Sequence, residues 1–190
     1  PAFSRREILW GLCALPAIAR ADGYAPKLAV QVYVWTQQLR KEKRTLAEGL
    51  SDVIAGCRAA GYERAELMNS FFTPEIREQT ISLLKQHGLQ IPIVYSGGVM
   101  HTEAEARKSI ASILEFADVV APIGTRIIDV NPTPKPKKAA KTDGELAVQA
   151  RAINRLDEQL KEKGFDLILH HHDPEMLNEA FDYEKRVSFV

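Results

Sequence analysis

The sequence has little cysteine and no excess of charge of either sign. Its 190 residues include two cysteines, Cys13 and Cys57, with no Cys-x-x-Cys pair, which excludes a disulfide framework and a thiolate zinc site. Lys and Arg total 25, as do Asp and Glu, so the basic field typical of nucleic-acid binding is missing. No apolar run reaches the roughly 18–20 residues of a transmembrane helix. We therefore expect no nucleic-acid partner and no membrane span, and any metal must be bound by His and carboxylates.

The first 21 residues resemble an export signal. Arg5 and Arg6 form a twin-arginine pair, an apolar stretch from Ile8 to Ile18 follows, and residues 19–21 fit an Ala-x-Ala cleavage site. An ordinary amphipathic first helix is the alternative. The order of the three regions favours the signal and predicts a periplasmic or otherwise exported protein. The chain starts at Pro1 rather than Met, so we expect its true start to lie upstream.

From residue 22 to residue 190 the sequence alternates between strand and helix patterns. Short apolar runs predict strands over 28–35, 65–68, 90–95, 126–130 and 165–170. Apolar residues three and four apart predict helices between them. Because each helix must cross over the sheet between neighbouring strands, five such units predict a parallel α/β sheet.

Three local details sharpen this pattern. Thr73 and Pro74 are typical of a helix start, and Ser96-Gly97-Gly98 is expected to end the third strand. Residues 132–141 contain three prolines and four lysines, which predicts an exposed loop. The lysines of this loop could meet a phosphate, although solvated loops of this kind are more common.

Two architectures fit five strand–helix units. The sheet is either a section of a (β/α)8 barrel of the TIM type, with about five of eight units present, or an open doubly wound sheet. The length of the units suits a barrel of about 250 residues. Neither Gly-x-Gly-x-x-Gly nor Gly-x-x-x-x-Gly-Lys follows any strand, which removes the usual indication of a nucleotide site.

Polar and aromatic side chains follow the predicted strands. In both architectures functional residues lie at the carboxyl ends of the strands, where this sequence has Trp35, Glu66, Tyr95, Asp129, Asn131 and a cluster from His170 to Glu175. Alternation puts His170 and His172 on one face. Imidazole and carboxylate suit Zn, Mn, Fe, Co or Ni, and such a metal can polarise a hydroxy-carbonyl substrate. A polar strand end without catalytic function is the alternative, and the aromatic residues could equally be barrel packing.

The stretch His170-His171-His172-Asp173-Pro174-Glu175-Met176 resembles a known fifth-strand motif, His-Asn-His-Asp-x-Glu-x. Many xylose isomerase-like TIM barrels carry it, a family that includes sugar phosphate isomerases, tagatose epimerases and inosose dehydratases. The sequence departs from the motif at His171. Residues 61–67 are also similar to the family's second strand, which ends in Glu. The resemblance covers about residues 28–190.

The resemblance implies a metal-dependent sugar isomerase or epimerase that moves a proton next to a carbonyl. It makes Glu175 the first metal ligand, for Mn, Zn, Co or Mg. Glu175 and His172 are our catalytic candidates. The substrate-binding candidates, taken from the resemblance and from the strand ends, are His170, Glu66, Trp35, Tyr95 and Asn131.

The family's remaining ligands come from strands six to eight. We therefore expect the recorded chain to be truncated and inactive alone. The substrate expected for the complete protein is a small sugar or polyol. A lyase or dehydratase on the same scaffold is one alternative, and a non-catalytic half-barrel that binds carbohydrate or self-associates is another. A homo-oligomer is compatible with each of these.

Overall fold

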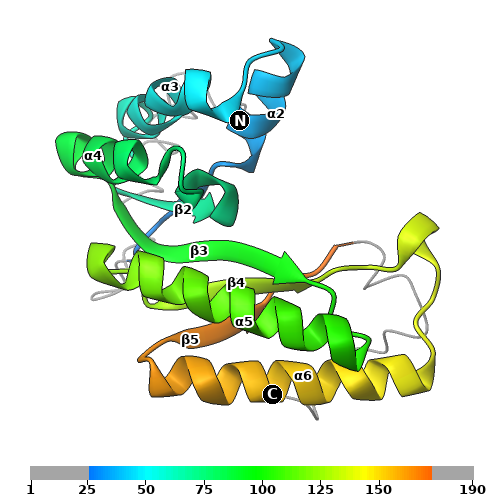
Figure 1. The fold of residues 1–190 in the computed structure, drawn as a ribbon. Coiled ribbons are helices and arrows are strands. Elements are labelled where there is room, and N and C mark those ends of the chain that lie inside the picture. Colours follow the sequence, from blue (N-terminus) through cyan, green and yellow to red (C-terminus); the bar gives the residue numbers. More distant parts are fainter. Residues whose placement is uncertain (1–25, 173–190) are drawn as a thin grey trace, which may run out of the picture.

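Five parallel strands form one sheet in the order in which they occur along the chain (Figure 1). The computed structural model describes residues 26–172, so the expected signal at 1–21 and Glu175 lie outside the described residues. The strands are β1 (Val30–Gln31), β2 (Arg64–Met68), β3 (Gln90–Gly98), β4 (Ile127–Pro132) and β5 (Asp166–Leu169). The helices are α2 (Tyr33–Lys41), α3 (Leu46–Ala59), α4 (Arg77–His87), α5 (Glu103–Val120) and α6 (Asp143–Glu162), with short 3-10 turns η1 (Asn69–Phe72), η2 (Ala121–Ile123) and η3 (Pro136–Lys138).

The strand order decides between the two architectures that the sequence allows. A doubly wound sheet reverses its strand order at a switch point. Within residues 26–172 no reversal occurs, because each strand from β1 to β5 pairs with the next. This is the strand order of a section of a (β/α)8 barrel.

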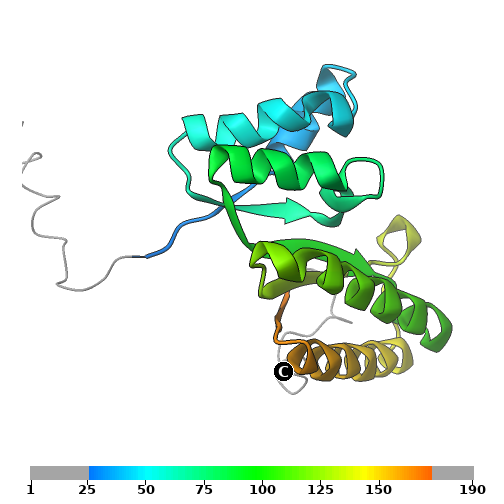
Figure 2. The same cartoon turned by 60° about the vertical axis from the view of Figure 1, so that its left-hand side comes forward.

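The hydrophobic core lies between the helices and one face of the sheet. Every second strand residue faces it, and the completely buried ones include Ala65, Leu67, Val94, Ile128 and Val130. They form one cluster with Leu50 of α3, Ile113 of α5 and Leu156 of α6. Helix α3 packs beside α4, and α5 packs beside α6 (Figures 1 and 2). None of the helices within residues 26–172 combines the length and apolarity needed to cross a membrane. The opposite face of the sheet, here called the site face, takes the alternate side chains.

The first predicted strand is wrong over most of its length. Strand β1 covers only two residues, and the chain enters helix α2 at Tyr33. The reason is packing. Leu39 and Trp35 of α2 lie against Gly49 and Gly56 of α3, where a Cβ atom would collide with the Leu39 side chain or lie 3.1 Å from Trp35 Nε1. Burial against α3 therefore overrides the strand preference of the β-branched and aromatic residues.

Two further boundaries differ from the sequence prediction. Helix α4 begins at Arg77 instead of Pro74, because residues 74–76 form a turn in which the Ile76 N–H donates to the Thr73 carbonyl oxygen at 3.1 Å. Strand β3 continues through Gly97 and Gly98, which pair with β4 at Asn131 and Pro132. A Cβ atom on Gly97 would lie 2.7 Å from the Asn131 carbonyl oxygen. The glycines therefore mark a close approach of two backbones rather than the end of the strand.

The proline- and lysine-rich loop is only partly exposed, which corrects the sequence prediction. Lys141 is 6% exposed, and its Nζ donates to the Pro132 carbonyl oxygen at 3.4 Å and to Gln149 Oε1 at 2.7 Å. Lys135 Nζ contacts the Glu145 carboxylate at 2.9 Å. Both lysines thus fasten the loop to the carboxyl end of β4 and to helix α6.

We expect Gly97→Ala to lower the free energy of unfolding by about 1–3 kcal/mol, because the added methyl group overpacks the β3–β4 contact. Gly144→Ala is the matched control: its Cβ would have only Thr142 Oγ1 nearby, at 3.9 Å. It lies in helix α6, where alanine is favoured over glycine by up to about 1 kcal/mol. Urea unfolding of both variants measures the difference, and a Gly97→Ala protein as stable as the wild type would contradict the close approach.

Candidate functional site

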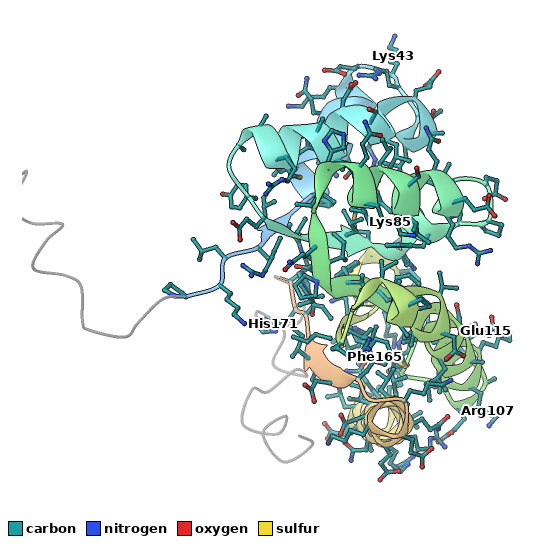
Figure 3. The ribbon with its side chains drawn as sticks, turned by 90° about the vertical axis from the view of Figure 1, so that its left-hand side faces the viewer. Lys43, Lys85, Arg107, Glu115, Phe165 and His171 are labelled. Carbon is teal, nitrogen blue, oxygen red and sulfur yellow. The ribbon has the colours of Figure 1, made fainter. Side chains whose placement is uncertain are left out.

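A row of polar side chains crosses the site face of the sheet. Parallel register pairs Gln31 with Glu66 and Tyr95 with Asp129, and register partners point to the same face. His170 follows β5, and its backbone N–H donates to the Val130 carbonyl oxygen at 2.9 Å. Figure 3 shows the two ends of β5, with Phe165 before the strand and His171 after it. The row therefore lies at and just below the carboxyl ends of the strands.

A pocket of about 280 Å³ lies at this end of the sheet. Its walls come from β1, α2, β2, β3 and the segment after β5, and its lining residues are Gln31, Tyr33, Met68, Tyr95, His170 and His172. It combines aromatic and apolar surface with two imidazoles. Such a mixture suits a small polar molecule with a hydrophobic face.

Asp129 and His170 form the central contact of the site. His170 Nδ1 lies 2.8 Å from Asp129 Oδ2, and Asp129 is 5% exposed. With Asp129 ionised, the carboxylate can only accept, so the protonated Nδ1 of His170 donates the hydrogen bond and keeps its proton. This tautomer makes Nε2 the ring nitrogen that can accept a proton. The arrangement is that of a general base oriented by a carboxylate.

The other ring contacts hold His170 in place. The Tyr95 and His170 ring centroids are 5.0 Å apart in an edge-on arrangement, and those of His170 and His172 are 4.7 Å apart. Asn131 Nδ2 donates to the His170 carbonyl oxygen at 3.0 Å. Tyr95 therefore supports the imidazole from β3, and Asn131 fixes the backbone that carries it.

Glu66 lies on the site face next to this pair. Burial is the main cause that raises its pKa to about 7, and the neighbouring Asp129 carboxylate raises it further. A hydrogen bond from Gln31 and the positive potential of His170 act in the opposite direction. Glu66 Oε1 is buried and has no hydrogen-bond partner among the described residues. The Glu66 carboxyl group thus exchanges its proton near neutral pH.

No family model and no curated protein matches the sequence, but solved structures match the fold. The 3-keto-D-glucoside 4-epimerase YcjR from E. coli shares 14% identity, with a TM-score of 0.58 over 76% of this chain and 56% of that chain. A sugar phosphate isomerase/epimerase from Parabacteroides distasonis shares 17% identity, with a TM-score of 0.57 over 83% and 55%. The probable 3-DHS dehydratase AsbF from Bacillus anthracis also shares 17%, with a TM-score of 0.57 over 77% and 53%.

The fold is that of part of a TIM barrel. The chain spans about half the length of these solved barrels. The partial barrel expected from the sequence is confirmed as a fold. Its site face corresponds to the inner face of a barrel, because the helices of a TIM barrel form the outer ring.

The barrel brings together four of the residues that the sequence singles out: Glu66, Tyr95, His170 and His172. The expected position of Trp35 at a strand end is wrong, because it lies in α2 against Gly56. It is not among the described residues that line the pocket, and its substrate-binding role stays a prediction. Asn131 is 5% exposed and its side chain donates to the His170 backbone, and its substrate-binding role stays a prediction.

Asp129 has a role at this barrel site that the sequence reasoning did not assign. The sequence does distinguish Asp129, because it is the one charged residue in β4, Ile127–Pro132, whose other residues are apolar except for Asn131. Alternation alone would have placed it on the face of Ile127 and Asn131. What the sequence could not supply was the partner, which lies 41 residues further along the chain.

The described part of the barrel does not by itself make a metal centre. Residues 26–172 contain no group of three or more His, Cys, Asp or Glu side chains arranged to hold a metal ion. Glu175, the predicted first ligand, lies outside the described residues. The metal dependence implied by the resemblance therefore stays a prediction.

We expect Glu66→Gln to stabilise the barrel above neutral pH. The folded-state pKa of Glu66 is raised from 4.5 to about 7, so its contribution to stability is complete below pH 4.5 and is lost as the pH rises to about 7. Glutamine stays neutral, so between pH 4.5 and about pH 7 the free energy of unfolding of the variant should rise by roughly 1–3 kcal/mol relative to that of the wild type. Urea unfolding at pH 4 and pH 8 measures this gain. Glu63→Gln, at an exposed carboxylate, is the control, and parallel stability curves for Glu66→Gln and wild type would contradict the assignment.

Proposed function

We propose that this chain contributes five β/α units to an enzyme that isomerises or epimerises a sugar or polyol. The Asp129–His170 pair carries the proposal, because it presents an oriented imidazole to a pocket at the carboxyl ends of the strands. The similarity to a solved sugar epimerase and to a sugar phosphate isomerase/epimerase supports the substrate class. The twin-arginine pattern of Arg5 and Arg6 adds the proposal that the enzyme is exported, which favours a free sugar over a phosphorylated one.

The proposed reaction is a proton transfer next to a carbonyl. His170 Nε2 removes a proton from the carbon beside the carbonyl, the electron pair of the C–H bond forms a C=C bond, and the carbonyl oxygen takes a proton from His172. The product is a neutral enediol. Isomerisation follows when His170 returns its proton to the former carbonyl carbon and the hydroxyl on the neighbouring carbon loses its proton to His172, which leaves the new C=O bond there. Epimerisation follows when a solvent proton adds to the opposite side of the original carbon, the hydroxyl formed from the carbonyl returns its proton to His172, and His170 releases its proton to solvent. Asp129 keeps the His170 ring oriented and stabilises its protonated form.

A dehydratase is the second candidate, since one similar solved structure is the probable 3-DHS dehydratase AsbF. Its first step would be the same removal of a proton next to a carbonyl. The enediol-type intermediate would then lose a hydroxyl group from the neighbouring carbon as water. Product analysis by NMR separates the two outcomes, because only dehydration changes the composition of the sugar.

We expect the complete protein to exchange a sugar C–H proton with solvent and His170→Gln to lower this rate by about 10²–10⁴-fold, the usual contribution of a general base. Asp129→Asn should lower it less, because the imidazole remains but is poorly oriented. The measurement is deuterium incorporation from D₂O into a panel of free aldoses, ketoses and keto-glycosides. His87→Gln, in the last turn of α4, is the control. A His170→Gln protein that exchanges as fast as the control would contradict the role of His170.

Metal dependence is the second part of the proposal and has its own test. We expect the complete protein to bind one Mn²⁺ per chain, with Glu175→Gln weakening the binding by about 10–100-fold or more, as loss of a supporting group already does. Equilibrium dialysis with Mn²⁺, Zn²⁺, Co²⁺ and Mg²⁺ measures this without an activity assay. Equal binding by the wild type and Glu175→Gln would remove Glu175 from the metal site.

A further inference from the structure

The polar row on the site face continues from His170 into the interior of the barrel. His170 contacts Asp129 of β4, and Asp129 in turn lies beside Glu66 of β2. Strand β3 lies between β2 and β4 in the sheet. In a TIM barrel the inward side chains of alternate strands meet in one layer, which is why residues of β2 and β4 reach each other across β3. Two carboxyl groups and one imidazole thus form a continuous chain that ends in the pocket.

The surroundings of Glu66 favour a neutral acid over a carboxylate. Its Oε1 atom is buried without a hydrogen-bond partner among the described residues. A buried anion with an unsatisfied oxygen is costly, whereas a protonated carboxyl group needs less solvation. Gln31, its register partner on β1, is uncharged. Asp129 already carries the negative charge that His170 requires, and a second ionised carboxylate beside it is unfavourable.

We propose that Glu66 is a positioning residue that holds a proton against Asp129 and so controls the charge of the Asp129–His170 pair. Glu66 acts through Asp129, because it is not among the described residues that line the pocket. While Glu66 is neutral, the pair carries one negative charge and His170 can accept a substrate proton. When Glu66 ionises, the added negative charge favours a protonated His170, which no longer acts as a base. The use of this control in catalysis rests on the proposed function, but the linkage between the Glu66, Asp129 and His170 side chains does not.

Other titratable groups also lie on this face of the sheet and are distinguished from the linked Glu66, Asp129 and His170 side chains. Tyr33, Tyr95 and His172 lie around the pocket, and alternation places Arg64 of β2 and Asp166 of β5 on the same face near the amino ends of the strands. Arg64 contacts Glu63 at 3.8 Å. Glu63 is an exposed carboxylate next to the same strand and offers a matched control for Glu66.

The experiment is an NMR titration of the complete protein with ¹³C-labelled glutamate side chains and ¹⁵N-labelled histidine. We expect the Glu66 carboxyl signal to titrate near pH 7 rather than near 4.5, and the His170 ring signals to change at the same midpoint because Asp129 links the two groups. Glu66→Gln should remove this change from the His170 signals, while Glu63→Gln leaves it in place. A Glu66 signal that titrates near 4.5, or a His170 curve that is the same in Glu66→Gln and wild type, would overturn the proposal.

Two further measurements keep the test decisive. If Glu66→Gln does not fold, Asp129→Asn tests the same linkage. Loss of the Asp129 charge should lower the titration midpoint of Glu66, and an unchanged midpoint would overturn the proposed linkage. With a substrate, Glu66→Gln should remove the loss of kcat near pH 7 with little change in KM. Absence of any sugar exchange together with a coupled titration would refute the proposed function alone. Sugar proton exchange together with uncoupled titrations would refute the linkage of Glu66 to His170 alone.

Discussion

The parallel pairing of β3 with β4 is the constraint on which the site depends. Their register runs from Ile93–Ile127 to Gly98–Pro132, and it aligns the strand ends that carry Tyr95, Asp129 and Asn131. The pairing holds to the last residue because Gly97 lets the two backbones approach closely. Strand β5 then adds to β4, and Asn131 extends that alignment to His170 beyond the end of β5. A shift of one residue between β3 and β4 would turn the site residues toward the core.

Charge at the site is organised around one buried carboxylate. Asp129 is almost completely buried, so it requires a partner, and the Nδ1 proton of His170 is that partner. Satisfying Asp129 in this way orients the imidazole that faces the pocket. The same buried charge disfavours ionisation of Glu66, which has an orphaned oxygen. Burial and the neighbouring Asp129 charge therefore together raise the pKa of Glu66 within this row of side chains.

Much of the architecture could be predicted from local patterns, and the exceptions have physical causes. The helices from α3 to α6 and the strands from β2 to β5 follow the apolar periodicity of the sequence. The first strand does not, because Trp35 and Leu39 gain more by packing on the glycines of α3 than by extending an edge strand. Gly97 and Gly98 resemble a strand end in the sequence, yet they serve a backbone contact that only the partner strand reveals. Lys141 resembles a solvated loop residue, yet it closes that loop on Pro132 and Gln149.

The sequence by itself determined that alternating strands and helices make a parallel sheet and that Glu66, Tyr95, His170 and His172 lie at or near the carboxyl ends of its strands. Periodicity and chain order are local properties, so they are readable without a structure. Only the tertiary structure decided the strand order, and with it the barrel over the doubly wound sheet. It also decided that Asp129 pairs with His170, that Asn131 binds the His170 backbone and that Trp35 lies in helix α2. These outcomes depend on contacts between residues far apart in the chain. The free energy of those contacts depends on burial in the folded protein, which local sequence preferences do not contain.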